Sequence, residues 1–581
     1  MILQALTEYY EALVAQGKLS PPGWDDAFQV SYGLELADDG TLLDLISYLS
    51  EQPRGKKTVL APQKMRVPAH PTRTAGVSAN FLCDNSSYML GADAKGKPQR
   101  TKECFAACAA LHRQLLADVD TPAARAVLAF FDTWQPDDAP QHPLLAPYWD
   151  SITGNANLTF CYGMKPVAED KAIADAWQRH YDRGDTEGDL IQCLVTGRQE
   201  PLARLHPLIK GVRDAQSSGA ALVSFNGTAF SSYGHEQGEN APVGTFASFA
   251  YTTALNALLA DKEHCQFIGD TTVVCWAQHG EPVYQDAGLA ALFGPPEGVT
   301  DQELRALLGK LARGEPAQWR SFQLQPEEHF YILGLAPNAS RLSVRFFLRD
   351  TFGDFMKHVE QHNGDMEIAR PSFDKFETLP LWKLLAETVN QNARSKAAAP
   401  QMAGDMLRTI LTGGPYPATL LNGVHLRIRA EHDVTRGRAA IIKGYYLRRP
   451  NLLPKEVLTV KLNEDACYMP YVLGRLFAVL EFLQTDANPG INATIKDKYF
   501  NAASATPAAI MPLLINLGQK HLRKLSAPKK IHYSKQITAL LGKVDEAYPA
   551  RFTLPEQGAF QLGYYHQVQK QYTKKEEQEN V

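Results

Sequence analysis

The sequence predicts an α+β protein in which a mixed α/β N-terminal part, of one or more domains, precedes a C-terminal helical bundle. Two patterns favour this class. Before about residue 351, strand-like and helix-like segments alternate without forming repeated βαβ units. After it, strand signals fade, and amphipathic helical segments follow one another across short loops that contain Gly and Pro. The 581 residues allow about two to four domains.

The N-terminal part begins with a hairpin signal, because Asp39-Gly40 lies between two apolar runs. A polar, Pro-containing stretch then places a sub-boundary near 136–150. Strand-like and helix-like segments continue as far as a strand-loop-strand pattern at 329–350. We therefore predict a mixed domain over 1–350.

The C-terminal third consists of helical patterns. They lie at 351–363, 376–392, 402–412, 417–430, 436–447, 470–485, 506–524 and 533–547. We predict a helical connecting region over 351–450 and a helical bundle over 451–581. The charged end TKKEEQEN predicts a frayed tail. No apolar run is long enough to span a membrane.

Residues 203–226, ARLHPLIKGVRDAQSSGAALVSFN, raise the question of catalysis, because they contain a histidine and two adjacent serines. A serine nucleophile on an elbow requires Gly-x-Ser-x-Gly, but Ala215 occupies the position of the first glycine. The alternative that stays open is a serine hydrolase or guide-RNA-processing nuclease that uses His206 with Ser217 or Ser218.

Other catalytic and metal-binding motifs are missing from the sequence. It contains no P-loop, no His-Glu-x-x-His and no Cys-x-x-Cys. His358 and His362 have the i, i+4 spacing of a metal site, but they are better explained as solvated helix histidines. We expect no catalytic residue, no metal and no cofactor.

Two polar loops are better suited to holding nucleic acid. Residues 72–91 and 203–226 combine basic side chains with amides, hydroxyls and, in the first loop, aromatic rings. Basic groups hold phosphates, an amide can recognise a base edge, and an aromatic ring can insert between bases. The predicted residues for binding duplex DNA and reading its base edges are Arg73, Ser78, Asn80, Phe81, Asn85, Lys210, Arg213, Gln216, Ser217, Ser218 and Asn226.

The C-terminal region is basic. Residues 424–581 hold 23 Lys and Arg against 14 Asp and Glu, whereas the rest of the chain holds 36 against 49. Such asymmetry suggests a surface that meets a polyanion, and interleaved aromatic residues suit a single strand. The predicted contacts to a displaced strand are Arg427, Arg429, Arg436, Arg438, Arg448, Arg449, Lys520, Arg523, Lys524, Lys529, Lys530 and Lys535.

Several long motifs resemble one family. They include MILQALTEYYEALVAQGKLSPPGW, NFLCDNSSYMLG, CLVTGRQEPLARLHPLIKGVRDAQSSGAALVSFN, SSYGHEQGENAPV, IGDTTVVCWA and NATIKDKYFNAASATPAAIMPLLI. In this order they resemble the large subunit of the type I-C CRISPR surveillance complex, Cascade, nearly from end to end.

The resemblance implies a non-enzymatic protein of the prokaryotic cytoplasm. Such subunits recognise the PAM in double-stranded target DNA, start strand separation and R-loop formation, and help to hold the displaced strand. The implied partners are the guide RNA (crRNA), the 5′-handle-binding subunit, the backbone subunits, the small subunits and the trans-acting helicase-nuclease. In this subtype the C-terminal region resembles the small subunit and is also made separately by internal translation. A scaffold without DNA contact is a further alternative.

Overall fold

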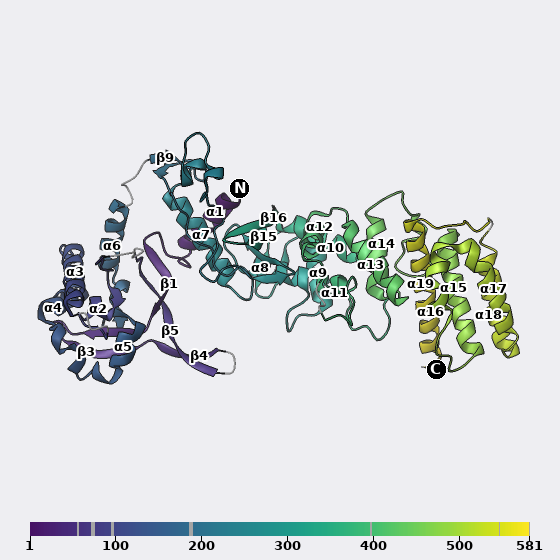
Figure 1. Ribbon diagram of the computed structural model, residues 1–581, viewed down its shortest axis with the longest axis horizontal. Coiled ribbons are helices and arrows are strands. Elements are labelled where there is room, and N and C mark those ends of the chain that lie inside the picture. The colour runs from purple at the N-terminus through teal and green to yellow at the C-terminus, as the bar shows by residue number, and fades with distance from the viewer. Residues whose placement is uncertain are drawn as a thin grey trace. The chain divides into compact units, whose positions relative to one another are not determined.

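The computed structural model describes residues 1–581 apart from 55–56, 71–75, 95–97, 185–189, 395–397, 545–546 and 580–581. The chain forms two compact units, which Figure 1 shows coloured along the sequence. Unit 1 comprises Met1–Pro207 and Val223–Ala254, and unit 2 comprises Leu208–Leu222 and Leu255–Val581. The chain crosses between the units three times, and the third crossing falls within helix α7 (Thr245–Ala260).

Unit 1 consists of small sheets with helices packed on them. One sheet has the strand order β3-β2-β7-β6 with β8 paired to β7, a second has the order β1-β5-β4, and β9 pairs with β10. Its strands are β1 (Trp24–Val30), β2 (Tyr32–Leu36), β3 (Leu42–Ser47), β4 (Leu49–Arg54), β5 (Lys57–Pro68), β6 (Cys83–Asn85), β7 (Asn157–Tyr162), β8 (Lys165–Pro166), β9 (Leu190–Gln192) and β10 (Gln199–Pro201). Its helices before α7 are α1 (Ile2–Ala15), α2 (Ser86–Met89), α3 (Pro98–Leu116), α4 (Pro122–Thr133), α5 (Trp149–Asn155) and α6 (Lys171–Gly184).

The predicted hairpin at Asp39-Gly40 is confirmed as the turn between β2 and β3, where Leu36 pairs with Leu42. Gly40 has a φ of +81°, and a Cβ at this position would lie 2.2 Å from the backbone nitrogen of Phe130 in α4. The turn therefore needs glycine for its conformation and for its close packing on the helix.

Unit 2 begins with an antiparallel sheet of the order β11-β12-β15-β16. The strand-loop-strand pattern predicted at 329–350 is the β15–β16 hairpin. Where the structure describes the chain beyond Thr351, it contains helices and no strand, so the predicted α+β class with a helical C-terminal part is confirmed. The elements up to this point are β11 (Gln266–Ile268), β12 (Thr271–Ala277), α8 (Val283–Phe293), α9 (Asp301–Ala312), β13 (Ala317–Trp319), β14 (Phe322–Leu324), β15 (His329–Asn338) and β16 (Arg341–Thr351).

The helices that follow share one apolar core, which continues into the sheet of unit 2. They are α10 (Phe352–Met366), α11 (Leu381–Ala386), α12 (Pro400–Thr412), α13 (Ala418–Glu431), α14 (Arg436–Leu447), α15 (Met469–Ala487), α16 (Ile495–Ala505), α17 (Pro507–Leu522), α18 (Ala527–Leu541) and α19 (Leu554–Glu579). The division into domains at 1–350, 351–450 and 451–581 stays a prediction.

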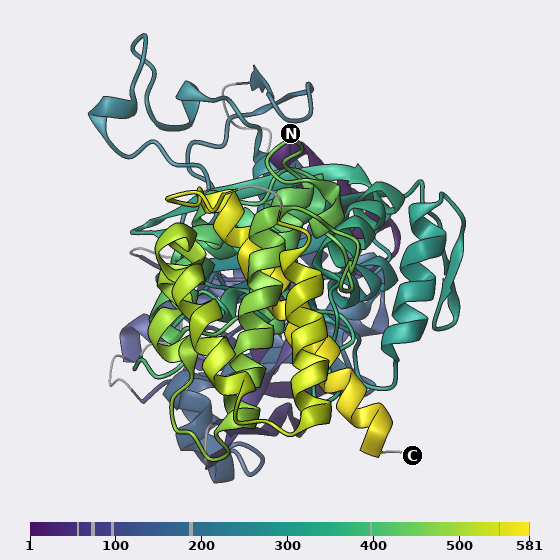
Figure 2. The same ribbon diagram turned by 90° about the vertical axis from the view of Figure 1, so that its right-hand side faces the viewer.

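Helix α15 is the centre of the C-terminal bundle, whose long helices run side by side in Figure 2. It packs most closely on α19. A Cβ on Gly474 would lie 1.9 Å from the carbonyl oxygen of Phe560, and a Cβ on Gly563 would lie 2.1 Å from that of Tyr471. Two glycines thus bring the helix backbones into direct contact.

The described helices differ from the sequence expectations in three places. The helix expected at 376–392 is only the short α11, because Pro380 delays its start. No prediction covers α16 or α19. The end of the chain, expected as a frayed tail, continues α19 as far as Glu579.

Candidate nucleic-acid interface

The second predicted loop, Lys210–Ser218, is a short polar loop that belongs to unit 2. An antiparallel bridge between Ile209 and Ala220 closes its base, and both residues are buried. The backbone N–H of Lys210 donates to Oδ1 of Asn256 at 2.8 Å, and that of Arg213 donates to Oγ1 of Thr272 at 3.1 Å. The loop backbone is therefore fixed to α7 and β12.

The loop side chains are exposed while its backbone is held. Lys210, Arg213, Gln216, Ser217 and Ser218 are all exposed. Within the described part of the chain, the side chains of Gln216, Ser217 and Ser218 make no hydrogen bond. Three positions of the loop have a positive φ, and glycine occupies two of them, 211 and 219, which lets the loop turn sharply. This arrangement leaves the side chains of Gln216, Ser217 and Ser218 available to a ligand, whereas Arg213 already contacts Asp214 at 3.8 Å and the ring of Phe267.

Most of the described residues of the first predicted loop lie in the core of unit 1. Phe81 is 1% exposed and stacks on Trp177 with ring centroids 5.6 Å apart. Asn80 is 5% exposed, and its backbone N–H donates to Oδ2 of Asp84 at 3.1 Å. The expectation that these two side chains reach DNA is not met in this structure, because both lie beneath the surface.

Other members of the predicted set have mixed positions. Oδ1 of Asn85 accepts the N–H of Ser87 at 3.0 Å and caps α2, which is a structural role. Ser78 is exposed, and Asn226 is exposed in unit 1. Arg73 lies outside the described residues.

No contact among the described residues supports the alternative of a serine hydrolase or nuclease. His206 belongs to unit 1, and its Nδ1 hydrogen-bonds with the hydroxyl of Tyr251 at 2.7 Å. Burial lowers the pKa of this imidazole. Ser217 and Ser218 belong to unit 2, and no histidine among the described residues hydrogen-bonds to either serine. A nucleophile-base pair is thus not assembled in the described structure.

The histidines at 358 and 362 also have internal partners. Nδ1 of His358 donates to the carbonyl of Leu411 at 2.8 Å, and Nδ1 of His362 contacts the hydroxyl of Tyr416 at 2.8 Å. His362 is buried, which corrects the expectation of a solvated side chain, and burial lowers its pKa to about 3. The described residues contain no group of three or more ligating side chains placed for a metal ion.

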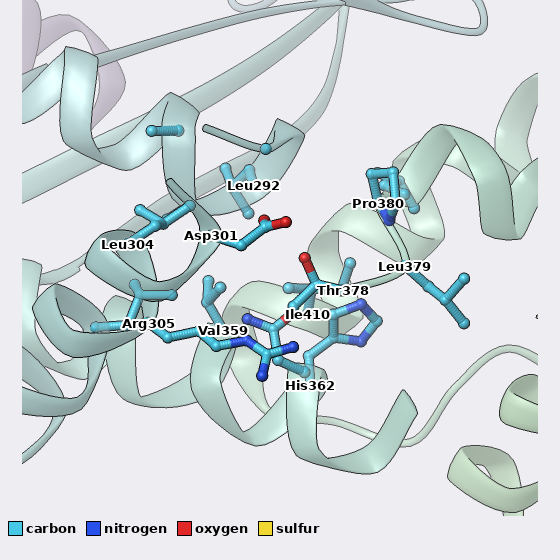
Figure 3. A pocket seen from close by; sticks show the side chains of 16 residues that line it. Leu292, Asp301, Leu304, Arg305, Val359, His362, Thr378, Leu379, Pro380 and Ile410 are labelled. Atoms are coloured by element: carbon cyan, nitrogen blue, oxygen red, sulfur yellow. The ribbon is translucent and has the colours of Figure 1, made fainter. Parts of the chain in front are cut away.

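Figure 3 shows the pocket beside His362, where Leu292, Leu304 and Ile410 surround Asp301 and Arg305. Its volume of about 30 Å³ is close to the volume of one water molecule. A substrate or cofactor does not fit in this space.

Three arginines of the basic segment 427–449 are buried in ion pairs. Arg436 pairs with Asp374 at 3.0 Å, Arg438 with Glu387 at 3.3 Å and also with Glu431, and Arg448 with Asp365 at 2.6 Å. Each of these three guanidinium side chains is less than a tenth exposed.

The remaining arginines of this cluster also contact the protein. Arg427 pairs with Glu431 at 2.6 Å, Arg429 donates to Gln557 at 3.1 Å, and Arg449 donates to the carbonyl of Tyr416 at 2.6 Å. The prediction that Arg436, Arg438 and Arg448 line a strand is therefore corrected, because their buried charges pair with acids of unit 2. For Arg427, Arg429 and Arg449, which are half-buried or exposed, a contact with a strand stays a prediction.

The cations of 520–535 have the opposite environment. Lys520, Arg523, Lys524, Lys529, Lys530 and Lys535 are all exposed at the end of α17 and along α18. We call these six residues the α17–α18 cationic track. Lys529 pairs with Asp486 at 3.2 Å, and Lys524 donates to Oδ1 of Asn488 at 2.7 Å. The other four have no ion pair within the described residues.

Family comparison gives the chain its place among known proteins. The family model described as CRISPR-associated protein (Cas_Csd1) matches residues 6–572. The chain belongs to this CRISPR-associated family. No curated protein matches it. The family confirms the coarser part of the resemblance, and the large-subunit role and the type I-C subtype stay predictions.

Three cations of this Cas_Csd1 chain were not predicted. Arg475, Lys543 and Lys570 line a cavity in the C-terminal bundle together with Lys535. They come from α15, the turn after α18 and α19, so no short sequence window contains them. Among the described helices, none has the length and apolar character needed to cross a bilayer.

Proposed function

We propose that this chain is the non-catalytic large subunit of a type I-C RNA-guided DNA-surveillance complex. In this role it recognises the PAM in duplex DNA, helps to open the strands and form the R-loop, and stabilises the displaced strand. Membership of the CRISPR-associated family and the resemblance of its motifs support the proposal. The division of work follows from RNA-guided recognition, in which protein reads the PAM and base pairing reads the rest.

The polar loop of unit 2 is the observation that carries this proposal. Its backbone is held at both ends, and the side chains of Gln216, Ser217 and Ser218 are exposed without internal hydrogen bonds in the described chain. A glutamine amide can hydrogen-bond an adenine edge, while Lys210 and Arg213 can hold phosphates. A fixed loop loses little conformational entropy on binding, which favours a recognition role.

The α17–α18 cationic track supports the second part of the proposal. Exposed cations at successive turns suit the backbone of a single strand, whose phosphates they can follow. The N-terminus of α18 carries no acidic residue in its first turn, so its helix dipole adds to the positive potential. The proposed partners are the guide RNA, target DNA, the 5′-handle-binding, backbone and small subunits, and the helicase-nuclease.

Gln216→Ala tests PAM recognition in the assembled complex. We expect the difference in binding free energy between PAM and non-PAM duplexes to shrink by about 1–3 kcal/mol, the scale of a base-edge contact. Lys210→Ala should weaken both duplexes alike, because a phosphate contact carries no sequence information. Gln323→Ala, an exposed glutamine on β14 of the same unit, serves as the matched control. Wild-type discrimination by the Gln216 variant would assign PAM recognition elsewhere.

A further inference from the structure

A cavity of about 320 Å³ lies between α15, α18 and α19 in the C-terminal bundle. Its cationic lining consists of Arg475, Lys535, Lys543 and Lys570, and its one acid is Glu464. Three glutamines, at 536, 567 and 571, supply further polar groups. The cavity could hold about ten water molecules at about 30 Å³ each, which is enough for a phosphate with its sugar.

Arg475 is a buried cation without a carboxylate partner. It is 5% exposed, and its Nε donates to Oε1 of Gln567 at 3.2 Å. Its Nη1 donates to the main-chain carbonyls of Asn463 and Glu464 at 3.2 and 3.1 Å. In the described part of the chain no carboxylate pairs with it, and burial lowers the pKa of its guanidinium.

Other buried arginines of unit 2, unlike Arg475, have carboxylate partners. Arg436, Arg438 and Arg448 each contact a carboxylate at 3.3 Å or less. Arginine stays protonated even when it is buried, so its charge needs compensation from an anion. For Arg475, which lines the cavity, an anion inside the cavity would supply that compensation.

Two of the lysines around the cavity contact the loop at Glu464. The ammonium of Lys543 donates to the main-chain carbonyl of Glu464 at 2.6 Å, and that of Lys570 pairs with the Glu464 carboxylate. Lys535 is exposed at the cavity and also belongs to the α17–α18 cationic track. Lys543 follows eight residues later, just beyond the end of α18. Cavity and track therefore share one cation.

We propose that this cavity binds a backbone phosphate of a single nucleic-acid strand, with Arg475 as its buried ligand and Lys535, Lys543 and Lys570 around the phosphate. The inference rests on the proposed function, in which the bundle follows the displaced strand. Continuity with the track favours a strand over free phosphate, because a strand that contacts the track passes Lys535 at the cavity. The planar guanidinium fork fits phosphate oxygens.

Fluorescence anisotropy of the full chain with a labelled oligo(dT) 20-mer tests the inference over a range of salt concentrations. The double variant Lys543→Gln with Lys570→Gln should bind more weakly and lower the slope of log K against log salt by about 0.7, the value for one phosphate on a single strand. Lys461→Gln with Lys498→Gln removes two exposed lysines of unit 2 that do not line the cavity. This control should keep the wild-type slope.

Glu464→Gln provides an independent variant that leaves the cations in place. It removes the competing carboxylate and releases Lys570, so we expect tighter oligonucleotide binding than in the wild type. An unchanged slope in the folded double variant, together with unchanged affinity in the Glu464 variant, would overturn the inference.

The source of the phosphate is decided by a second measurement. Calorimetric titration with inorganic phosphate could show a site that is present in the wild type and lost in the double variant, while oligonucleotide binding is the same in both. That result would overturn the strand assignment in favour of a free anion. PAM-dependent duplex binding should be normal in the double variant, so failure of this inference can be separated from failure of the proposed function.

Discussion

Removing charge from the α17–α18 cationic track should reduce the salt dependence of single-strand binding by a calculable amount. Lys529 and Lys524 already have partners in Asp486 and Asn488. Lys520, Arg523 and Lys530 are exposed and have no ion pair within the described residues, so the perturbation is their triple change to Gln. If each contacts one phosphate, the slope of log K against log salt falls by about 2, at about 0.7 per contact. Between about 50 and about 200 mM salt, the wild type should then lose about 20-fold more affinity than the variant.

The assay is anisotropy of the full chain with a single-stranded oligonucleotide at four salt concentrations. A matched control changes Lys455, Lys461 and Lys498 to Gln, which removes the same charge from exposed positions of unit 2 outside the track. This control should keep the wild-type slope, because net charge alone does not determine local phosphate contacts. Equal slopes in the wild type and the track variant would show that the cations form only a solvated helix face.

Three further predictions concern stability. Nε2 of His112 accepts the N–H of Leu82 at 2.9 Å, and burial lowers its pKa to about 4, so the unfolded chain takes up the proton first. Unit 1 should therefore lose stability as pH falls from about 6.5 towards about 4. The urea midpoint should fall less over this pH range in His112→Gln than in the wild type, and an equal or larger fall in the variant would contradict this. Gly563→Ala should lower the free energy of unfolding, measured by chemical denaturation, by about 1–3 kcal/mol or more, because its Cβ would meet the backbone of α15. Gly364→Ala, which has open space around its Cβ, should change this free energy by less than about 1 kcal/mol. Arg438→Met should lower the free energy of unfolding by about 3–5 kcal/mol, because it breaks the ion pairs of this buried cation with Glu387 and Glu431. The salt dependence of DNA binding should not change, and a changed slope would show that Arg438 contacts DNA.

Local sequence patterns predicted the β2–β3 and β15–β16 hairpins and most C-terminal helices, but they failed at α19. This helix contains Gly558 and Gly563, which weaken a helical pattern. In the fold they are contact points, since a Cβ on Gly558 would lie 2.9 Å from the ring of Tyr446. A single sequence does not distinguish a glycine that ends a helix from one that allows two helices to touch.

Charge counting had the same difficulty. The basic segments 427–449 and 520–535 look alike in sequence, yet the first is neutralised by acids from other elements, among them Asp365, Asp374 and Glu387. These acids lie tens of residues away along the chain, so only the fold brings them to the arginines. The cavity around Arg475 was missed for the same reason, because its lining is dispersed over three helices and a loop.

The two polar loops separate according to what surrounds them. The polar side chains of 210–218 are exposed as predicted, because burial is confined to Ile209, Val212 and Ala220 and to the glycine at 219. Asn80 and Phe81 lie just before β6, separated from it by Leu82, and the buried Leu82 and Cys83 place this segment in the core of unit 1. Composition alone gave both loops the same interpretation, whereas burial separates them.

PAM discrimination by the assembled complex, measured with and without this chain, tests the proposed role most directly. Electrophoretic mobility shifts with matched PAM and non-PAM duplexes give the two affinities at one salt concentration, which must be stated because phosphate contacts depend on it. The proposed role predicts that the complex prefers the PAM duplex only when the chain is present, and that Gln216→Ala lowers this preference while Gln323→Ala does not. Full PAM preference in a complex that lacks the chain would contradict it.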